Sequence, residues 1–244
     1  MNKYWGYDQF RQGQDSTIEH ILEGKDCLAL LPTGGGKSIC YQVPGLAQEG
    51  VCLVISPLIA LMQDQVKQLR QRGIKASAIT AGMNNHAIDI ELDNAIYGNT
   101  KFLYVSPERL RSELFKVRLA KMNINLIAVD EAHCISEWGY DFRPAYLLIS
   151  EIRKIKPKTP ILALTATATP EVVIDIQEKL EFKEKSVFQS SFTRQNLIYN
   201  TLETNNKLNR LIEFVSHKTE SGISWLAKHE KELKSCVNNS LTKA

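Results

Sequence analysis

Long apolar runs are missing from this chain of 244 residues: none approaches the roughly 20 residues that a membrane-spanning helix needs. The first ten residues, MNKYWGYDQF, also lack the apolar core of a secretory signal peptide. Internal repeats and low-complexity segments are absent too, which excludes repeat architectures. From these absences we expect a soluble intracellular protein without a membrane partner, cytoplasmic in a bacterium or nuclear in a eukaryote.

Cysteine is scarce and scattered. The five cysteines form no C-x-x-C pair and have no histidine-rich partner cluster, so the sequence carries no zinc-site spacing. An odd, dispersed set of this kind is typical of reduced thiols. Cys27 and Cys52 lie inside apolar runs, and we expect both to be small buried hydrophobic residues.

An excess of charge of one sign is lacking as well. The chain has 30 lysines and arginines against 27 aspartates and glutamates, and this net charge of +3 indicates no partner by itself. It still permits a local basic surface, which is enough for a nucleic-acid binder. The length suits one large α/β domain, or one domain with a fragment of another.

What the sequence does contain is a series of short apolar runs separated by helical patterns. Strands are predicted at CLALL (27–31), VCLVIS (51–56), FLYVS (102–106), LIAVD (126–130) and ILALT (161–165). Helices are predicted at residues 7–22, 37–47, 60–71, 108–114, 145–155 and 170–180, and a further one at 207–215. This alternation predicts an α/β fold: a parallel sheet with helices on both faces. Polar clusters follow the strands, and ligands in such folds bind at that edge of the sheet.

The loop after the first predicted strand contains Thr33, three consecutive glycines (Gly34, Gly35 and Gly36), Lys37 and Ser38. Glycines let successive backbone N–H groups form an anion-binding nest, and the N-terminus of the next helix adds favourable partial charge. Lys37 can reach the β- and γ-phosphates of a nucleotide, and the Ser38 hydroxyl can bind Mg²⁺. The strict P-loop pattern needs glycine where Leu31 stands, so this loop is a variant.

A second cluster, Asp130-Glu131-Ala132-His133, closes an apolar strand. Asp130 can hold a magnesium ion near the phosphates, and Glu131 can orient and deprotonate the attacking water. Taken alone, these residues are equally consistent with a helix cap and a solvated glutamate. Together with the glycine loop they predict a site for Mg²⁺ and ATP.

Two longer stretches are more specific. Residues 130–144, DEAHCISEWGYDFRP, and residues 31–46, LPTGGGKSICYQVPGL, resemble the RecQ family of superfamily 2 DNA helicases. Other stretches that resemble this family follow in its order: GYDQFRQGQ (6–14), SPLIALMQDQV (56–66), SPERL (106–110), ALTATAT (163–169) and SFTRQNL (191–197). Proline is usual in the family where Gln12 and Gln195 stand. The resemblance implies a RecA-like P-loop NTPase fold and ATP-dependent 3′-to-5′ unwinding of DNA, with roles in repair and recombination.

The resemblance also implies residue roles. Tyr7, Arg11 and Gln14 match the adenine-recognition motif of the family. Within it, Gln14 is expected to recognise the edge of the adenine base. His133 is expected to link the catalytic site to a neighbouring loop, and Thr165 and Thr167 to lie in the coupling motif. The family's aromatic-rich loop, which reports bound single-stranded DNA to the ATP site, corresponds here to Ser136, Trp138, Tyr140, Phe142 and Arg143. SPLIALMQDQV and SPERL match segments that touch the DNA backbone. Duplex junctions, a full-length helicase and a single-strand-binding protein are further expected partners.

The residues of this loop support the assignment independently. Trp138, Tyr140 and Phe142 alternate with small or polar residues, and exposed aromatic rings beside Arg143 suit base stacking and phosphate contact. The alternative is that Trp138 and Phe142 fill the core beneath the loop. A nearby basic run is equally consistent with an ordinary solvated face; it comprises Arg109, Arg111, Lys116, Arg118 and Lys121.

The domain organisation predicted from the sequence is an ATP-binding lobe at 1–200, a helix and the start of a linker at 201–222, and an unrelated polar tail at 223–244. Family members have a second RecA-like lobe that supplies an arginine finger. Such an arginine accelerates phosphoryl transfer by a factor of about 10³ to 10⁵. We therefore expect slow hydrolysis and no unwinding by this chain alone. Two alternatives stay open: a nucleotide- and DNA-binding module without motor activity, and an RNA helicase of the DEAH or DEAD type. The aromatic-rich loop favours the DNA enzyme.

Overall fold

The computed structural model describes residues 1–190, 201–206 and 209–210, and the chain divides into two units, Met1–Thr193 and Arg194–Ala244. In the second, residues 201–206 are exposed, and Asn209 and Arg210 are helical. The rest of the helix predicted at 207–215, the polar tail at 223–244 and all of SFTRQNL (191–197) lie outside the described residues.

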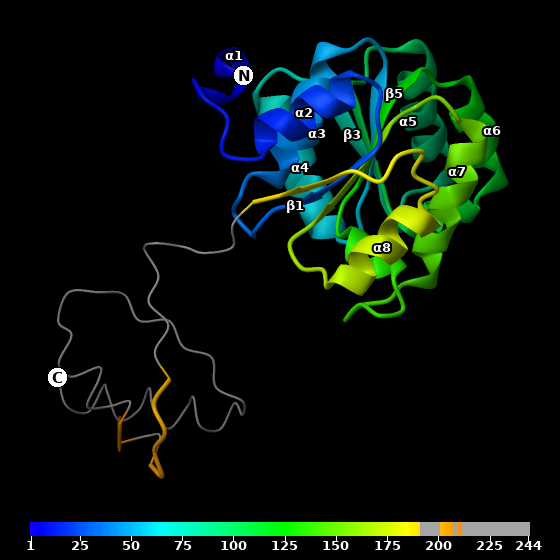
Figure 1. Ribbon diagram of the computed structural model, residues 1–244. Coiled ribbons are helices and arrows are strands. Elements are labelled where there is room, and N and C mark those ends of the chain that lie inside the picture. Colours follow the sequence, from blue (N-terminus) through cyan, green and yellow to red (C-terminus); the bar gives the residue numbers. More distant parts are fainter. Residues whose placement is uncertain (191–200, 207–208, 211–244) are drawn as a thin grey trace, which may run out of the picture. The chain divides into compact units, whose positions relative to one another are not determined.

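A seven-stranded sheet forms the centre of the first unit (Figure 1). Its strand order is β3-β4-β2-β5-β6-β1-β7, and every neighbouring pair is parallel. The strands are β1 (Cys27–Leu30), β2 (Val51–Ile55), β3 (Ala76–Ile79), β4 (Phe102–Val105), β5 (Ile124–Val129), β6 (Ile161–Thr165) and β7 (Val187–Gln189). All five predicted strands are confirmed, with small differences at their ends.

Helices cover both faces of the sheet, as predicted (Figure 1). One face packs against α2 (Gln14–Leu22), α3 (Lys37–Ala47) and α4 (Ile59–Gln71). The other packs against α5 (Asn85–Tyr97), α6 (Glu113–Lys121), α7 (Ile149–Ile155) and α8 (Pro170–Lys179). Shorter helices are α1 (Asn2–Trp5), η1 (Pro107–Arg111), η2 (Ala132–Ile135) and η3 (Pro144–Leu148).

Alternating side chains along the central strands build two separate cores. In β2, Leu53 and Ile55 pack on the α5–α8 face, whereas Cys52 and Val54 pack on the α2–α4 face. All four are almost completely buried, so this strand is apolar on both sides. Cys27 and Cys52 are free thiols buried in the second of these cores, which confirms the expectation for both.

Several elements differ from the sequence-based prediction. The predicted helix 7–22 begins only at Gln14, because Gly13 adopts a left-handed conformation with φ 84° and starts the helix there. The predicted helix 108–114 is broken at Ser112: a 3-10 turn ends before it, and the Ser112 hydroxyl accepts from the Phe115 N–H to begin α6. Within the described ranges, no helix is long and apolar enough to cross a membrane.

Candidate ATP site

Three adjacent strands, β5, β6 and β1, carry the predicted chemistry at their carboxyl ends. The acidic cluster follows β5, Thr165 ends β6, and the glycine loop follows β1. Since these strands are parallel neighbours, their loops emerge side by side at one edge of the sheet. Residues from three distant parts of the sequence are thereby brought to one place.

The glycine loop adopts conformations that only glycine tolerates well. Gly34 and Gly36 both have positive φ angles, 76° and 79°, and Gly36 is the N-cap of α3. A Cβ added at Gly35 would lie 2.8 Å from the Pro32 carbonyl oxygen. This curled backbone opens onto the N-terminus of an 11-residue helix, an arrangement that favours bound phosphate.

Gln14 holds the glycine loop from the side. Its amide nitrogen donates to the carbonyl oxygens of Gly35 and Gly36, each at 3.1 Å, while its amide oxygen accepts from the Arg11 N–H at 2.9 Å. Arg11 also donates from its guanidinium to the Gly34 carbonyl, at 2.7 Å. Gln14 is only 3 % exposed. The amide is thus fully engaged with the backbone, and reading a base edge would require it to exchange these bonds.

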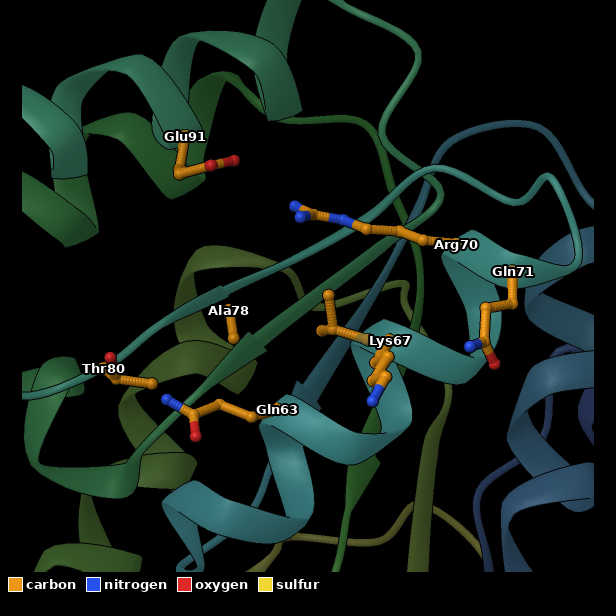
Figure 2. A pocket seen from close by; sticks show the side chains of 8 residues that line it. Gln63, Lys67, Arg70, Gln71, Ala78, Thr80 and Glu91 are labelled. Carbon is orange, nitrogen blue, oxygen red and sulfur yellow. The ribbon is translucent and has the colours of Figure 1, made fainter.

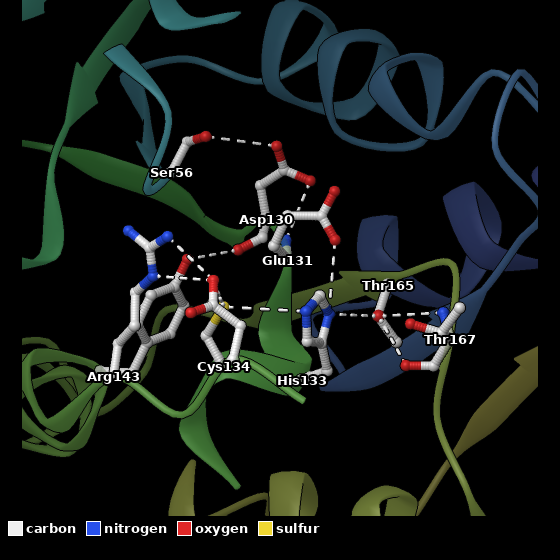
Figure 3. A network of polar contacts seen from close by, with 10 residues as sticks. Ser56, Asp130, Glu131, His133, Cys134, Arg143, Thr165 and Thr167 are labelled. Atoms are coloured by element: carbon white, nitrogen blue, oxygen red, sulfur yellow. Dashed lines mark hydrogen bonds and ion pairs between the residues drawn. The ribbon is translucent and has the colours of Figure 1, made fainter. Parts of the chain in front are cut away.

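Asp130 is a partly buried carboxylate beside the loop lysine. Its pKa is raised to about 6, first by burial and then by the neighbouring Glu131 carboxylate, while the Glu131 N–H, Lys37 and the Ser56 hydroxyl act in the opposite direction. The Ser56 hydroxyl lies 3.3 Å from the Asp130 carboxylate, as Figure 3 shows. A cation placed near Asp130 would favour its charged form.

Glu131 has a left-handed backbone conformation with φ 47°, one of two described non-glycine residues with positive φ. Such a conformation costs about 1–3 kcal/mol and is found preferentially at functional sites. Here the turn lets the Glu131 N–H donate to the Asp130 carboxylate at 3.0 Å and brings the Glu131 carboxylate to 3.4 Å from His133 Nδ1.

His133 connects this turn to the end of β6 (Figure 3). Its Nδ1 lies 2.9 Å from the Thr165 hydroxyl oxygen. That hydroxyl donates to the Thr167 carbonyl at 3.1 Å and also accepts from the Thr167 N–H at 3.3 Å. Because the single hydroxyl proton goes to Thr167, the Thr165 oxygen accepts from His133, which assigns a proton to Nδ1.

A buried hydrogen-bond chain beneath the site was not anticipated from the sequence. The hydroxyls of Tyr41 and Tyr104 lie 3.2 Å apart. Gln42, next to Tyr41, accepts from the Trp5 indole at 3.2 Å and donates to Gln65 at 2.9 Å. Burial raises the pKa of Tyr41, and a hydrogen bond with Ser38 opposes this rise. Tyr41, which no sequence motif indicated, therefore lies close to the predicted magnesium ligand Ser38.

One cleft of about 530 Å³ collects the predicted nucleotide residues. Its lining includes Tyr7, Arg11, Gln14, Thr33, Gly34, Gly36, Lys37, Ser38, Asp130 and Glu131. Gly35 and His133 do not line it; Gly35 accepts a hydrogen bond from Gln14, and His133 contacts the Glu131 carboxylate. In the described part of the chain, no three His, Cys, Asp or Glu side chains gather as a metal site. Mg²⁺ at Ser38 and Asp130 would thus need phosphate and water as its other ligands.

The aromatic-rich loop lies directly after this site. Trp138 is 77 % exposed and Tyr140 is fully exposed, so neither fills the core beneath the loop. Phe142 is half-buried, with the Lys179 ammonium 5.7 Å from its ring centre. Ser136 is buried, and Arg143 pairs with Asp141 at 2.8 Å. The alternative of core packing is therefore wrong for Trp138 and holds in part for Phe142.

The basic run that follows SPERL is partly neutralised. Lys116 pairs with Glu113 and Glu151, and Arg118 pairs with Asp89 and Asp93. Both cations form ion pairs with carboxylates of neighbouring helices. The basic run is therefore not a continuous positively charged surface.

Comparison with known proteins agrees with this geometry. The family model for the DEAD/DEAH box helicase matches residues 11–176. The chain is 42 % identical over 239 residues to the probable ATP-dependent DNA helicase RecS of Bacillus subtilis, covering 96 % of this chain and 48 % of RecS. It is 43 % identical over 231 residues to the ATP-dependent DNA helicase RecQ of the same organism, covering 93 % of this chain and 39 % of that protein. The chain thus spans less than half the length of these relatives.

Solved structures share the fold. The Hef helicase domain of Pyrococcus furiosus superimposes with a TM-score of 0.57 at 21 % identity, over 74 % of this chain and 38 % of Hef. The helicase MrfA gives a TM-score of 0.69 at 20 % identity, over 98 % of this chain and 39 % of MrfA. The sheet is therefore the RecA-like sheet of helicases. The chain belongs to the DEAD/DEAH box helicase family, and its sequence is similar to the RecQ-type ATP-dependent DNA helicases within it.

Proposed function

We propose that this chain is the ATP-binding lobe of a RecQ-type DNA helicase, which binds Mg·ATP in the cleft beside the glycine loop and single-stranded DNA at the aromatic-rich loop. The observation that carries the proposal is the convergence of Lys37, Ser38, Asp130 and Glu131 on one cleft. The names of the relatives support DNA as the nucleic acid.

The chain's own residues suit phosphoryl transfer. The glycine loop and the α3 N-terminus offer N–H donors to the phosphates, and Lys37 adds a positive charge. Bound Mg²⁺, held through Ser38 and Asp130, would neutralise charge that develops on the phosphates. Glu131, oriented by its strained turn and by His133, accepts a proton from the attacking water.

The aromatic-rich loop can couple the binding of single-stranded DNA to ATP hydrolysis. Trp138 and Tyr140 offer exposed rings for base stacking. The Arg143 N–H donates to the Cys134 carbonyl at 2.8 Å, and Cys134 directly follows His133. We infer that DNA on the rings changes the position of His133 and Glu131. In the family, a second lobe supplies an arginine that accelerates turnover, so we expect the ATP-binding lobe tested by itself to hydrolyse ATP slowly and not to unwind duplex.

ATP turnover with and without nucleic acid tests the proposal. We expect slow turnover that increases with single-stranded DNA and increases much less with RNA of the same sequence, since the 2′-OH lets a protein distinguish the two. Nucleotide binding without any turnover would instead favour a binding module without motor activity. Greater stimulation by RNA would favour an RNA helicase.

A further inference from the structure

The sheet ends at β3, and the free edge of this strand lies open between α4 and α5. Two open pockets of about 640 and 490 Å³ lie along it. Both are lined by Arg70 of α4 and Glu91 of α5; of β3, Ala78 lines the larger pocket, and Ala76 and Ser77 line the smaller one. Figure 2 shows that Arg70 and Glu91 extend into this opening from two sides. We call it the edge groove; it shares no residue with the ATP cleft.

Backbone groups of β3 face the edge groove. The Ala76 carbonyl accepts from Arg70 Nε at 2.7 Å, so it points away from β4. In a parallel strand every second residue points its backbone groups to the same side, and Ala78 therefore presents its N–H and C=O to the groove. Ala78 lines the larger pocket and is only partly buried. Such an unpaired edge is a template for another strand.

A buried hydroxyl in the groove lacks a partner. Ser77 is 3 % exposed and lines the smaller pocket, and its Oγ has no hydrogen-bond partner among the described residues. Leaving a buried polar group unpaired destabilises the fold. A bound group that reached this hydroxyl would remove that cost.

The charges around the groove are unbalanced. Lys67, Arg70 and Lys75 line it against the single carboxylate of Glu91. None of these three cations forms an ion pair within the described residues, whereas Lys116 and Arg118 elsewhere on the surface are each paired twice. The groove therefore favours an occupant with negative side chains.

We propose that the edge groove is a docking site for an extended, acidic segment of a partner protein, which adds as a further strand beside β3. The backbone of this segment forms hydrogen bonds with Ala78, and its carboxylates form ion pairs with Lys67 and Arg70. One of its polar groups forms a hydrogen bond with the Ser77 hydroxyl. This mode combines main-chain hydrogen bonds with side-chain selectivity and is independent of nucleotide binding.

Fluorescence anisotropy with three labelled eight-residue peptides tests this site on the intact chain. The first alternates valine and glutamate, the second alternates valine and lysine, and the third is the glutamate peptide with alternate backbone amides N-methylated. We expect saturable binding of the first and at least about tenfold weaker binding of the other two. Lys67→Glu and Arg70→Ala should each weaken the glutamate peptide about tenfold. Lys154→Ala, which removes an exposed cation on α7, should leave its affinity unchanged.

Lys67 is exposed and forms no ion pair with the described residues, so Lys67→Glu leaves the fold intact even if Arg70→Ala does not. The proposal is overturned if the glutamate peptide does not bind, if the N-methylated peptide binds equally well, or if Lys67→Glu retains full affinity. Light scattering that shows a dimer dissolved by Lys67→Glu would assign the groove to a second copy of the chain and would also overturn it.

Discussion

His133 Nδ1 and the Thr165 hydroxyl oxygen lie 2.9 Å apart, and this contact joins the turn after β5 to the loop after β6. Thr165 is completely buried and is held in turn by Thr167. The same imidazole nitrogen lies 3.4 Å from the Glu131 carboxylate. A movement of the loop after β6 therefore reaches the proposed water-activating residue through a single side chain.

Thr165→Val should change the state of the His133 ring. Valine has the shape of threonine but cannot accept from Nδ1, so we expect the Nδ1–H to turn to the Glu131 carboxylate alone and its resonance to shift. Nitrogen-15 NMR of the histidine side chains measures this directly, and nucleotide affinity should stay within about twofold. Thr165→Ser keeps the hydroxyl and serves as the control. A wild-type His133 spectrum in Thr165→Val would contradict the assigned hydrogen bond.

Gly36→Ala should disrupt the glycine loop. The added Cβ would lie 2.4 Å from the Gln14 amide nitrogen, in a backbone conformation with φ 79°. We expect a loss of about 1–2 kcal/mol from the backbone strain, together with loss of ATP binding. Gly24→Ala has a similar φ of 77° but nothing within 4 Å of its Cβ, so it should lose similar stability and keep ATP binding. Equal ATP affinity in the two variants would rule out the Gln14 contact as a support of the loop.

The fold was predictable where burial leaves a strong pattern. The five strands predicted from apolar runs are confirmed, since each lies in the interior of the sheet and is covered on both faces. The two missed strands, β3 and β7, are the edges. Ala76–Ile79 reads ASAI, whose small residues have little strand preference, and Val187–Gln189 has only three residues, two of them exposed. Helix α5 was missed because its apolar residues form only a weak stripe; its Asn84 cap is the signal that could have revealed it.

The convergence of the candidate nucleotide residues on one cleft was predictable because each motif is local in sequence. A glycine loop after a strand and an acidic cluster after another strand each specify a role, and parallel neighbours bring them together. The contacts that hold them were not predictable. Tyr41 and Tyr104 lie 63 positions apart, and only the packed sheet places their hydroxyls in contact. Likewise, the hydrogen bonds from Gln14 to the carbonyl oxygens of the glycine loop depend on where α2 packs.

Trp138→Ala should weaken binding of single-stranded DNA. Stacking of one base on an aromatic ring contributes about 1–3 kcal/mol, so the affinity should fall by a factor of about 5 to 150. Anisotropy of a labelled oligonucleotide measures it. Tyr97→Ala is the matched control, because Tyr97 is 74 % exposed but lies on α5 rather than on the loop. Equal losses in both variants would mean that the loop is not the DNA site.

Asp130→Asn should stabilise the free protein near neutral pH. Burial raises the Asp130 pKa from 3.8 to about 6, so the native state binds this proton more tightly than the unfolded state does. The wild-type residue therefore loses stability as the pH rises from about 4 through 6, by about 3 kcal/mol at most. Asparagine removes this penalty, and chemical denaturation without Mg²⁺ should show a gain at pH 7.5 that shrinks toward pH 4. A gain that is independent of pH would contradict the shifted pKa.

The glycine loop and the acidic turn are proposed to bind Mg·ATP together. Isothermal titration calorimetry of the wild-type chain, Lys37→Ala and the surface control Lys154→Ala tests this joint binding. We expect Mg·ATP to bind the wild type and Lys154→Ala with equal affinity, and Lys37→Ala to bind it at least about tenfold more weakly while keeping its fold. An affinity that is unchanged in Lys37→Ala would contradict the assignment of the cleft.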